Sequence, residues 1–317
     1  MDLTCHVGSL TFPNPVLTAS GTSGHGAELE AYFPLASLGA VVVKSLAWFP
    51  WAGNPAPRVH ETSSGMLNSV GLQGPGVEAW LEHDLPPLVA TGARVVVSIW
   101  GRTVEDYRRA ADLLADAPPA VVAVEVNLSC PNVEDRRSMF AHSASATEEV
   151  LVATAGCGRP RWAKLSPNVT DLVEIAEAAR WGGAEAVTLV NTVMGMAIDV
   201  QTRTYSLGAG GGGLSGTAVH PVAVRAVHDV AAALPGLAIV GVGGVARGED
   251  AAELLLAGAA AVQVGTATFA DPRAPARVLE GLRTWAGRQR MASVSELVGA
   301  VHRQVGGPEL EDTEATR

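Results

Sequence analysis

The stretch Val121-Val-Ala-Val-Glu-Val-Asn-Leu-Ser-Cys-Pro-Asn132 decides both the fold class and the expected place of the chemistry. Its first half is apolar almost throughout, which is typical of a strand in a parallel sheet with both faces buried. Its second half brings Asn127, Cys130 and Asn132 within six residues, and Pro131 breaks the strand there. A thiol and two amides at the C-terminal end of a strand indicate an active site of an α/β barrel.

Cys130 by itself does not establish a site, because a cysteine beside a proline is also an ordinary small buried side chain. Three other predicted strand ends carry polar residues as well: Lys44, Lys164, and the pair Asn191 and Thr192. One lysine at a strand end can extend from a core to water. Lysines and amides at the ends of four strands favour a shared functional site.

Strand patterns alternate with helical patterns along the chain, which predicts right-handed βα units. We expect an α/β protein with a (β/α)8 TIM barrel, in one domain that spans residues 1–317, since eight such strands are present. A doubly wound open sheet would bury its strands equally well. The expected strands are Val16–Ala19, Ala40–Lys44, Arg94–Ile99, Val121–Val126, Arg161–Leu165, Ala186–Val190, Leu237–Gly241 and Ala261–Val264, after a hairpin of Thr4–Val7 and Leu10–Phe12.

Long connections follow the second, fourth and sixth of these strands, at Leu46–Gln73, Pro131–Ala146 and Val193–Val219. Long loops at one end of a barrel usually build or cover the site. The run Gly210-Gly-Gly-Gly213 fits either a flexible linker or a loop that contacts phosphate. The acidic C-terminal tail, about 307–317, is expected to be flexible.

The composition excludes several classes of protein. A hydrophobic content of 48% with 17% charged residues describes a soluble enzyme with a large core, and the net charge of −10 argues against nucleic-acid binding. Cys5, Cys130 and Cys157 form no CxxC pair, so this chain is expected to ligate neither zinc nor an iron–sulfur cluster. The N-terminus has no signal pattern, and no run of about 18 apolar residues occurs, which predicts a cytoplasmic protein that does not associate with membranes.

The last two predicted strands end in glycine turns, Gly241-Val-Gly-Gly244 and Gly265-Thr266. Glycine lets backbone amides approach a phosphate, and barrels favour a phosphate site after strands seven and eight. Such turns also occur for steric reasons alone. The spacing matches neither a Rossmann fingerprint nor a P-loop.

Ten segments, in order and with compatible gaps from about residue 3 to about residue 305, resemble the class 1 dihydroorotate dehydrogenases. The resemblance implies an FMN-binding (β/α)8 barrel, an oxidoreductase that converts dihydroorotate to orotate in pyrimidine synthesis. The segments are Thr18-Ala-Ser-Gly21, Val43-Lys-Ser45, Gly53-Asn-Pro-Ala-Pro-Arg58, Gly65-Met-Leu-Asn-Ser-Val-Gly-Leu-Gln73, Asn127-Leu-Ser-Cys-Pro-Asn-Val133, Lys164-Leu-Ser-Pro-Asn-Val-Thr-Asp171, Val190-Asn-Thr-Val-Met-Gly195, Gly213-Leu-Ser-Gly216, Gly241-Val-Gly-Gly244 and Val264-Gly-Thr266.

The same resemblance implies roles for individual residues. Cys130 would be the catalytic base that takes the C5 proton of dihydroorotate while hydride leaves C6, and Lys164 would stabilise charge at the flavin N1/O2 edge. Lys44 would contact both flavin and substrate. The implied flavin contacts are Ser20, Lys44, Ser45, Ser98, Asn127, Lys164, Val190 and Gly216, with the phosphate at Gly243, Gly244, Gly265 and Thr266. The implied substrate contacts are Lys44, Asn68, Ser69, Val70, Gly71, Leu72, Asn127, Asn132, Asn191 and Thr192.

The motifs divide between two subclasses that use different electron acceptors. Most motifs resemble subclass B, in which the catalytic subunit, expected here as a homodimer, pairs with a subunit that carries FAD and a [2Fe–2S] cluster and passes electrons to NAD. Lys44-Ser45 and Ser98-Ile99 resemble subclass A, whose homodimers reduce fumarate. We favour subclass B. Two other readings remain: a related dihydropyrimidine as substrate, and a flavin-binding barrel without catalysis.

Three local segments depart from the family pattern. Glu134-Asp-Arg-Arg137 follows the cysteine where relatives are often rich in glycine. Trp100 replaces a residue that is usually small, and would either shape the flavin pocket or cap the barrel. Trp48-Phe-Pro-Trp51 is also unusual, and fits either packing within the lid or docking of a partner.

Overall fold

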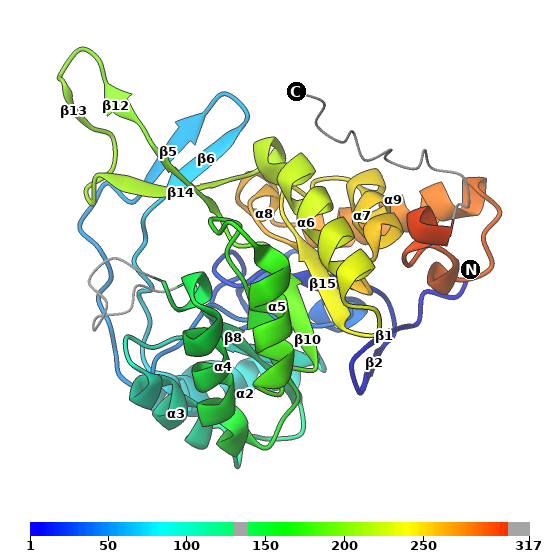
Figure 1. The fold of residues 1–317 in the computed structure, drawn as a ribbon, viewed down its shortest axis with the longest axis horizontal. Helices are drawn as coiled ribbons and strands as arrows, with labels where there is room; N and C mark the ends of the chain where they lie inside the picture. Colours follow the sequence, from blue (N-terminus) through cyan, green and yellow to red (C-terminus); the bar gives the residue numbers. More distant parts are fainter. Residues whose placement is uncertain (130–138, 304–317) are drawn as a thin grey trace, which may run out of the picture.

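The computed structural model in Figure 1 describes residues 1–129 and 139–303, and its largest sheet has eight parallel strands in the spatial order β3, β16, β15, β10, β9, β8, β7, β4. The two outer strands meet. Leu17 and Ala40 form a parallel bridge, and the Thr18 hydroxyl donates to the carbonyl oxygen of Val42 at 3.2 Å and accepts from its amide at 2.8 Å. The sheet therefore closes into a (β/α)8 barrel, and the open-sheet alternative is wrong. The strands are β3 (Val16–Thr18), β4 (Val41–Val42), β7 (Val95–Ile99), β8 (Val121–Asn127), β9 (Arg161–Lys164), β10 (Ala186–Leu189), β15 (Ala238–Val242) and β16 (Ala261–Val264).

Helices follow seven of the eight barrel strands within the described residues and surround the barrel (Figure 1). Between β3 and β4 the chain makes only the 3₁₀ turns η1 (Glu28–Ala31) and η2 (Leu35–Ser37). No helix in residues 1–129 and 139–303 combines the length and the apolar character that crossing a membrane requires. The main helices are α2 (Leu85–Ala90), α3 (Val104–Asp112), α4 (Ala144–Ala153), α5 (Leu172–Trp181), α6 (His220–Ala233), α7 (Gly248–Ala257), α8 (Ala267–Ala270) and α9 (Ala274–Arg288).

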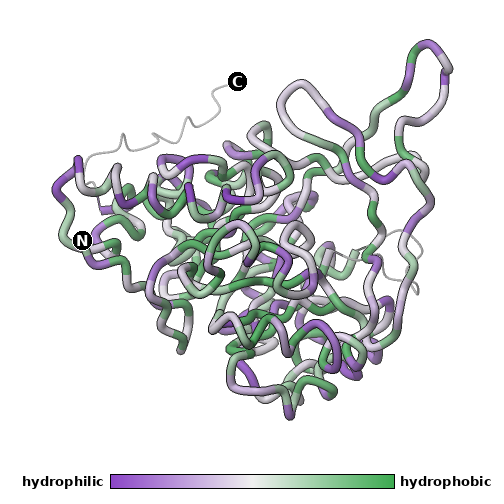
Figure 2. Tube along the Cα trace, turned by 180° about the vertical axis from the view of Figure 1, so that it is seen from behind, coloured by the Kyte–Doolittle hydropathy of each residue, from purple (hydrophilic) through white to green (hydrophobic). Residues whose placement is uncertain are grey.

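The core lies within the barrel and between the barrel and its helices. Figure 2 shows hydrophobic residues along the strands in the middle of the molecule. The N-terminal end of the barrel is covered by the hairpin of β1 (Cys5–Val7) and β2 (Leu10–Phe12), where the ring of Phe12 packs edge-on against Trp162 at 6.0 Å. The hairpin covers the end of the barrel that carries no predicted site residue.

Two of the three long connections are not irregular loops. They form a four-stranded antiparallel sheet in the order β11, β14, β6, β5, which lies beyond the barrel rim (Figure 1). Its strands are β5 (Val59–Thr62), β6 (Gly65–Asn68), β11 (Val193–Met196) and β14 (Gly211–Ser215), and a small hairpin of β12 (Ile198–Asp199) and β13 (Thr204–Tyr205) extends from it. Part of the third connection, residues 130–138, and the acidic tail lie outside the described residues.

The glycine run is a strand, so its interpretation as a flexible linker is wrong. Residues 211–213 belong to β14, which pairs with β11 on one side and β6 on the other. A Cβ on Gly213 would collide with the side chain of Thr192, and one on Gly212 with the carbonyl oxygen of Asn68. The close approach of neighbouring segments therefore requires glycine at positions 212 and 213.

Candidate active site

A cavity of about 1420 Å³ lies at the C-terminal mouth of the barrel, between the strand ends and the sheet of β5, β6, β11 and β14. The pocket for a single small ligand usually measures about 300–1000 Å³, so this larger cavity suits a cofactor and a substrate together. All but one of the described residues that the sequence predicts for the site line it: Ser20, Lys44, Ser45, Asn68, Ser69, Val70, Gly71, Leu72, Asn127, Lys164, Val190, Asn191, Thr192, Gly216, Gly243, Gly244, Gly265 and Thr266.

Three predicted residues are not among those that line the cavity. Ser98 is fully buried behind the wall, where its hydroxyl lies 2.8 Å from that of Ser45. Cys130 and Asn132 lie outside the described residues. Ser129, the residue immediately before Cys130, does line the cavity.

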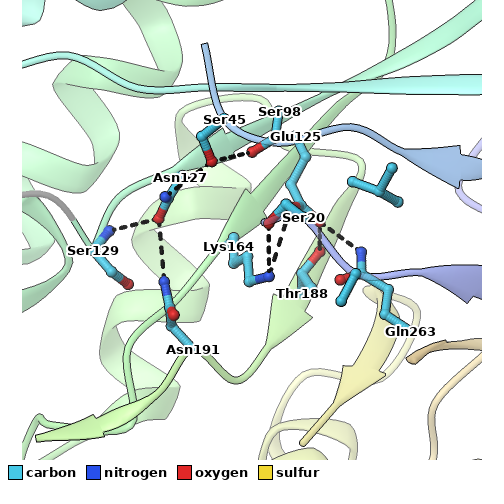
Figure 3. Close-up of polar contacts among 12 residues, drawn as sticks. Ser20, Ser45, Ser98, Glu125, Asn127, Ser129, Lys164, Thr188, Asn191 and Gln263 are labelled. Atoms are coloured by element: carbon cyan, nitrogen blue, oxygen red, sulfur yellow. Dashed lines mark hydrogen bonds and ion pairs between the residues drawn. The ribbon is translucent and has the colours of Figure 1, made fainter. Parts of the chain in front are cut away.

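The side chain of Asn127 connects three of the strand ends (Figure 3). Its amide nitrogen donates to the hydroxyl of Ser45 at 3.2 Å. Its oxygen accepts from the backbone amide of Ser129 at 3.2 Å and from the side-chain amide of Asn191 at 3.3 Å. These contacts fix which end of the Asn127 amide donates and which accepts, and such a fixed orientation is what recognition of a planar ring with amide groups requires.

Lys44 and Lys164 are the two lysines of the whole 317-residue sequence, and both line this cavity. Every other basic side chain, apart from histidine, is arginine, which keeps its proton under all ordinary conditions. Burial, and to a lesser degree the charge of Arg58, lowers the pKa of Lys44 below the ordinary lysine value. Both of the side-chain ammonium groups in the chain therefore line this one cavity.

Lys164 lies at the floor of the cavity and is only 5% exposed. Its ammonium donates to the hydroxyl of Ser20 at 3.0 Å and forms an ion pair with Glu125, 3.8 Å from Oε1 (Figure 3). Glu125 is fully buried. Sequence reasoning missed Glu125, although a single acidic residue inside the apolar strand Val121–Asn127 is a visible signal for a buried charge pair.

The segment from Ser69 to Leu72 turns its backbone toward the cavity. Gly71 and Leu72 both have positive φ angles, of 73° and 63°. Two side chains that also line the cavity hold the turn. The indole of Trp51 donates to the carbonyl oxygen of Gly71 at 3.0 Å, and the side-chain amide of Asn54 donates to the carbonyl oxygen of Ser69 at 3.1 Å. The two holding residues were not predicted, because their role depends on contacts between segments that sequence spacing does not reveal.

The unusual aromatic residues pack against one another. Phe49 makes edge-to-face contacts with Trp48, Trp51 and Trp100, at ring distances of 5.3, 6.5 and 5.7 Å. Trp100 is buried and is not among the residues that line the cavity, which supports its interpretation as a cap on the barrel. The guanidinium of Arg102 stacks on Trp51 at 3.8 Å. These contacts support packing as the interpretation of Trp48-Phe-Pro-Trp51.

The glycine turns after β15 and β16 meet at the other end of the cavity. Gly243 and Gly244 have φ angles of 142° and 68°, and a Cβ on Gly244 would lie 2.7 Å from the Cβ of His220. The hydroxyl of Thr266 donates to that of Ser215 at 2.8 Å. Two glycine-containing turns that line a cavity at the ends of the seventh and eighth strands match the usual phosphate site of a barrel.

A closed barrel whose strand ends direct lysines, amides and glycine turns into one large cavity has the organisation of a (β/α)8-barrel enzyme. The family model described as "Dihydroorotate dehydrogenase" matches residues 2–285. The chain therefore belongs to the dihydroorotate dehydrogenase family and is an oxidoreductase. The family resemblance inferred from the ten motifs is confirmed.

Three relatives show how close the similarity is. The chain is 48% identical to "Dihydroorotate dehydrogenase B (NAD(+)), catalytic subunit" of Alkaliphilus oremlandii over 295 residues, 93% of this chain and 97% of the relative. The protein of the same name from Desulforudis audaxviator is 48% identical over 301 residues, 95% of this chain and 97% of the relative. That from Geotalea uraniireducens is 44% identical, over 95% of this chain and 98% of the relative.

Proposed function

We propose that this protein is the catalytic subunit of a subclass B dihydroorotate dehydrogenase, which oxidises (S)-dihydroorotate to orotate in pyrimidine synthesis with FMN as the hydride acceptor. The convergence of Lys44, Lys164, Asn127 and Asn191 on one cavity carries this proposal. The similar proteins are named catalytic subunits of dihydroorotate dehydrogenase B (NAD(+)), and these names support the proposal. They favour subclass B over the fumarate-reducing alternative.

FMN is proposed to lie along the floor and one end of the cavity. The donor set fits this group: a buried ammonium, Lys164, at the floor, and the glycine turns at Gly244 and Gly265 for a phosphate. FMN would supply the hydride-accepting chemistry when bound. Lys164 would then stabilise negative charge at the N1/O2 edge. The remaining proposed contacts are Ser20, Lys44, Ser45, Ser98, Asn127, Val190, Gly216, Gly243 and Thr266, of which Ser98 acts from behind Ser45.

Dihydroorotate is proposed to bind between this floor and the sheet. The Lys44 ammonium would pair with the substrate carboxylate, because a partly buried cation gains most from an anionic partner. Asn127 and Asn191 would bind the ring amides in the orientation that their mutual hydrogen bond fixes. The other proposed contacts are Asn68, Asn132, Thr192 and the backbone of Ser69, Val70, Gly71 and Leu72.

Cys130 is proposed as the base that takes the C5 proton. The position of Ser129 on the cavity wall supports this proposal, since it brings the chain to the substrate one residue before Cys130. The hydrogen bond from the Ser129 amide to the Asn127 oxygen also holds this approach in place. Neither cysteine of the described residues lines the cavity, because Cys5 and Cys157 are buried elsewhere.

The electrons are proposed to pass to NAD through a second subunit that carries FAD and a [2Fe–2S] cluster, with the catalytic subunit itself a homodimer in the cytoplasm. An anaerobic titration of the purified chain with dihydroorotate, followed at the flavin absorbance, tests the first half-reaction. Stoichiometric bleaching is the expected result. The reduced protein is then mixed with NAD and, separately, with fumarate.

Reduced protein without its partner should react with NAD slowly. Rapid NAD reduction by the isolated chain would contradict the need for a partner, and rapid fumarate turnover would place the chain in subclass A. A yellow protein that dihydroorotate fails to bleach would refute the proposed substrate. A related dihydropyrimidine that bleaches it would then identify the alternative substrate.

A further inference from the structure

The floor of the cavity rests on a layer of polar side chains inside the barrel. Glu125, Thr188 and Gln263 are all fully buried and come from β8, β10 and β16, the fourth, sixth and eighth strands of the barrel. Alternate strands contribute the side chains of one layer in such a barrel, and these layers are normally filled by branched apolar residues. The carboxylate of Glu125 is therefore unusual in this layer.

The two oxygens of Glu125 have different surroundings (Figure 3). Oε2 accepts hydrogen bonds from the side-chain amide of Gln263 at 2.7 Å and from the hydroxyl of Thr188 at 3.1 Å. Oε1 has no hydrogen-bond donor within the described residues and lies 3.8 Å from the ammonium nitrogen of Lys164. The two donors hold the carboxylate in place, and its other oxygen faces the ammonium.

We propose that Glu125 is a positioning residue for Lys164: it keeps the ammonium at the cavity floor and limits the positive charge that the floor presents to the cofactor. The proposal rests on the proposed function in that Lys164 faces the flavin. The pair is electrically balanced while the cofactor is oxidised. When negative charge develops beside Lys164, part of the positive charge of the ammonium is already compensated by Glu125, which limits how strongly the floor favours the reduced cofactor.

Substitution of Glu125 by Gln removes the charge but keeps the shape and the ability to accept the two hydrogen bonds. With its counter-charge gone, Lys164 is free to approach the flavin and stabilise the reduced form more strongly. We expect the equilibrium constant for two-electron reduction of bound FMN to rise at least tenfold, a shift of about 30 mV in midpoint potential. Spectroelectrochemical titration of the holoenzyme without substrate measures this shift.

The same substitution in a Lys164→Met background shows whether Glu125 acts through Lys164. In the Lys164→Met background we expect Glu125→Gln to change the equilibrium constant for FMN reduction threefold or less. Glu125→Asp keeps the charge, so its reduction constant should stay within threefold of the parent even though its shorter side chain packs less well. An unchanged potential in Glu125→Gln, an equal shift with and without Lys164, or an Asp variant that behaves like Gln would each overturn the proposal.

The ion pair is also tested in the flavin-free protein by thermal melting. Removal of one partner leaves an unpaired buried charge, whereas removal of both does not. Glu125→Gln combined with Lys164→Met should therefore lower the melting temperature by less than the sum of the two single losses. If Glu125→Gln alone does not fold, a folded double variant supports the pair. Additive losses, or a double variant that folds no better than Glu125→Gln, would overturn it.

Neither the potential titration nor the melting experiment uses dihydroorotate. They therefore test the role of Glu125 separately from the proposed substrate. A holoenzyme that dihydroorotate does not reduce would refute the proposed substrate. It would not affect the comparison of variants by midpoint potential or by melting temperature. A chain that does not bind FMN would refute the cofactor, and the melting cycle of the apoprotein would still decide whether Glu125 and Lys164 act as a pair.

Discussion

The indole nitrogen of Trp51 donates a hydrogen bond to the carbonyl oxygen of Gly71 at 3.0 Å. This contact joins the aromatic residues that surround Phe49 to the backbone turn that is proposed to hold the substrate. The turn contains two consecutive residues with positive φ angles, Gly71 and Leu72, a conformation that neighbouring contacts must maintain. Trp51, which itself lines the cavity, therefore stabilises the shape of the binding turn.

Trp51→Phe removes this hydrogen bond and keeps an aromatic ring beneath Arg102. A net hydrogen bond contributes about 0.5–1.5 kcal/mol, so orotate affinity should fall about 2- to 10-fold, as measured by titration of the flavin absorbance. Trp48→Phe is the matched control, because the Trp48 indole donates to Asp106 at 2.8 Å and does not line the cavity. An equal loss of orotate affinity in both variants would contradict the role of Trp51.

The lowered pKa of Lys44 predicts a pH dependence of ligand binding. An anionic ligand prefers the protonated lysine, so orotate affinity should be constant below the pKa of Lys44 and fall by up to tenfold per pH unit above it. Because burial and Arg58 lower this pKa, the fall should begin below pH 10.5, the ordinary lysine value. Arg58→Gln should move the onset to higher pH. An affinity that stays constant up to pH 10.5 would contradict the prediction.

The lysine content of the chain allows a direct measurement of the same group. Selective ¹³C labelling of lysine gives signals from Lys44 and Lys164, the two lysines of the sequence. Lys44→Met assigns them. The Lys44 signal should titrate below pH 10.5 in the free protein and at a higher pH once orotate is bound.

Gly244→Ala should weaken FMN binding at least about tenfold, which corresponds to 1.4 kcal/mol. The new Cβ would lie 2.7 Å from that of His220 and push the turn into the proposed phosphate site, in addition to the strain of a positive φ angle. Gly236→Ala is the matched control: its φ angle is +88°, and a Cβ there meets nothing within 4 Å. Fluorescence titration with FMN separates the two effects. Equal FMN affinities of the Gly244→Ala and Gly236→Ala proteins would argue against a phosphate at this turn.

Cys130→Ser should slow the reduction of bound flavin by dihydroorotate by at least about 100-fold near neutral pH, because a serine hydroxyl is a poor general base. Stopped-flow single-turnover measurements report this step. Cys5→Ser is the control, since burial raises the pKa of the Cys5 thiol to about 12 and keeps it protonated. A Cys130→Ser protein with a near-normal rate would remove this thiol from the mechanism.

Much of the site could be predicted because its residues occur in short motifs at strand ends. The eight barrel strands appear where the apolar runs predict them, with ends shifted by a few residues. Lys44, Lys164 and Asn191 meet because parallel strands in a closed barrel all end at one rim. The sequence could not reveal that two loops form an antiparallel sheet, since the pairing of β6 with β14 joins segments about 145 residues apart.

The amino-acid sequence by itself determined the barrel, its family, and which side chains stand at the strand ends, because periodicity and motifs are local properties. Only the tertiary structure decided what those side chains contact. The pairing of Glu125 with Lys164, the hydrogen bond from Trp51 to Gly71, and the need for glycine in β14 all depend on contacts between residues that are far apart in the sequence. Folding brings these residues together, and their separation in space is not encoded in any one stretch of chain.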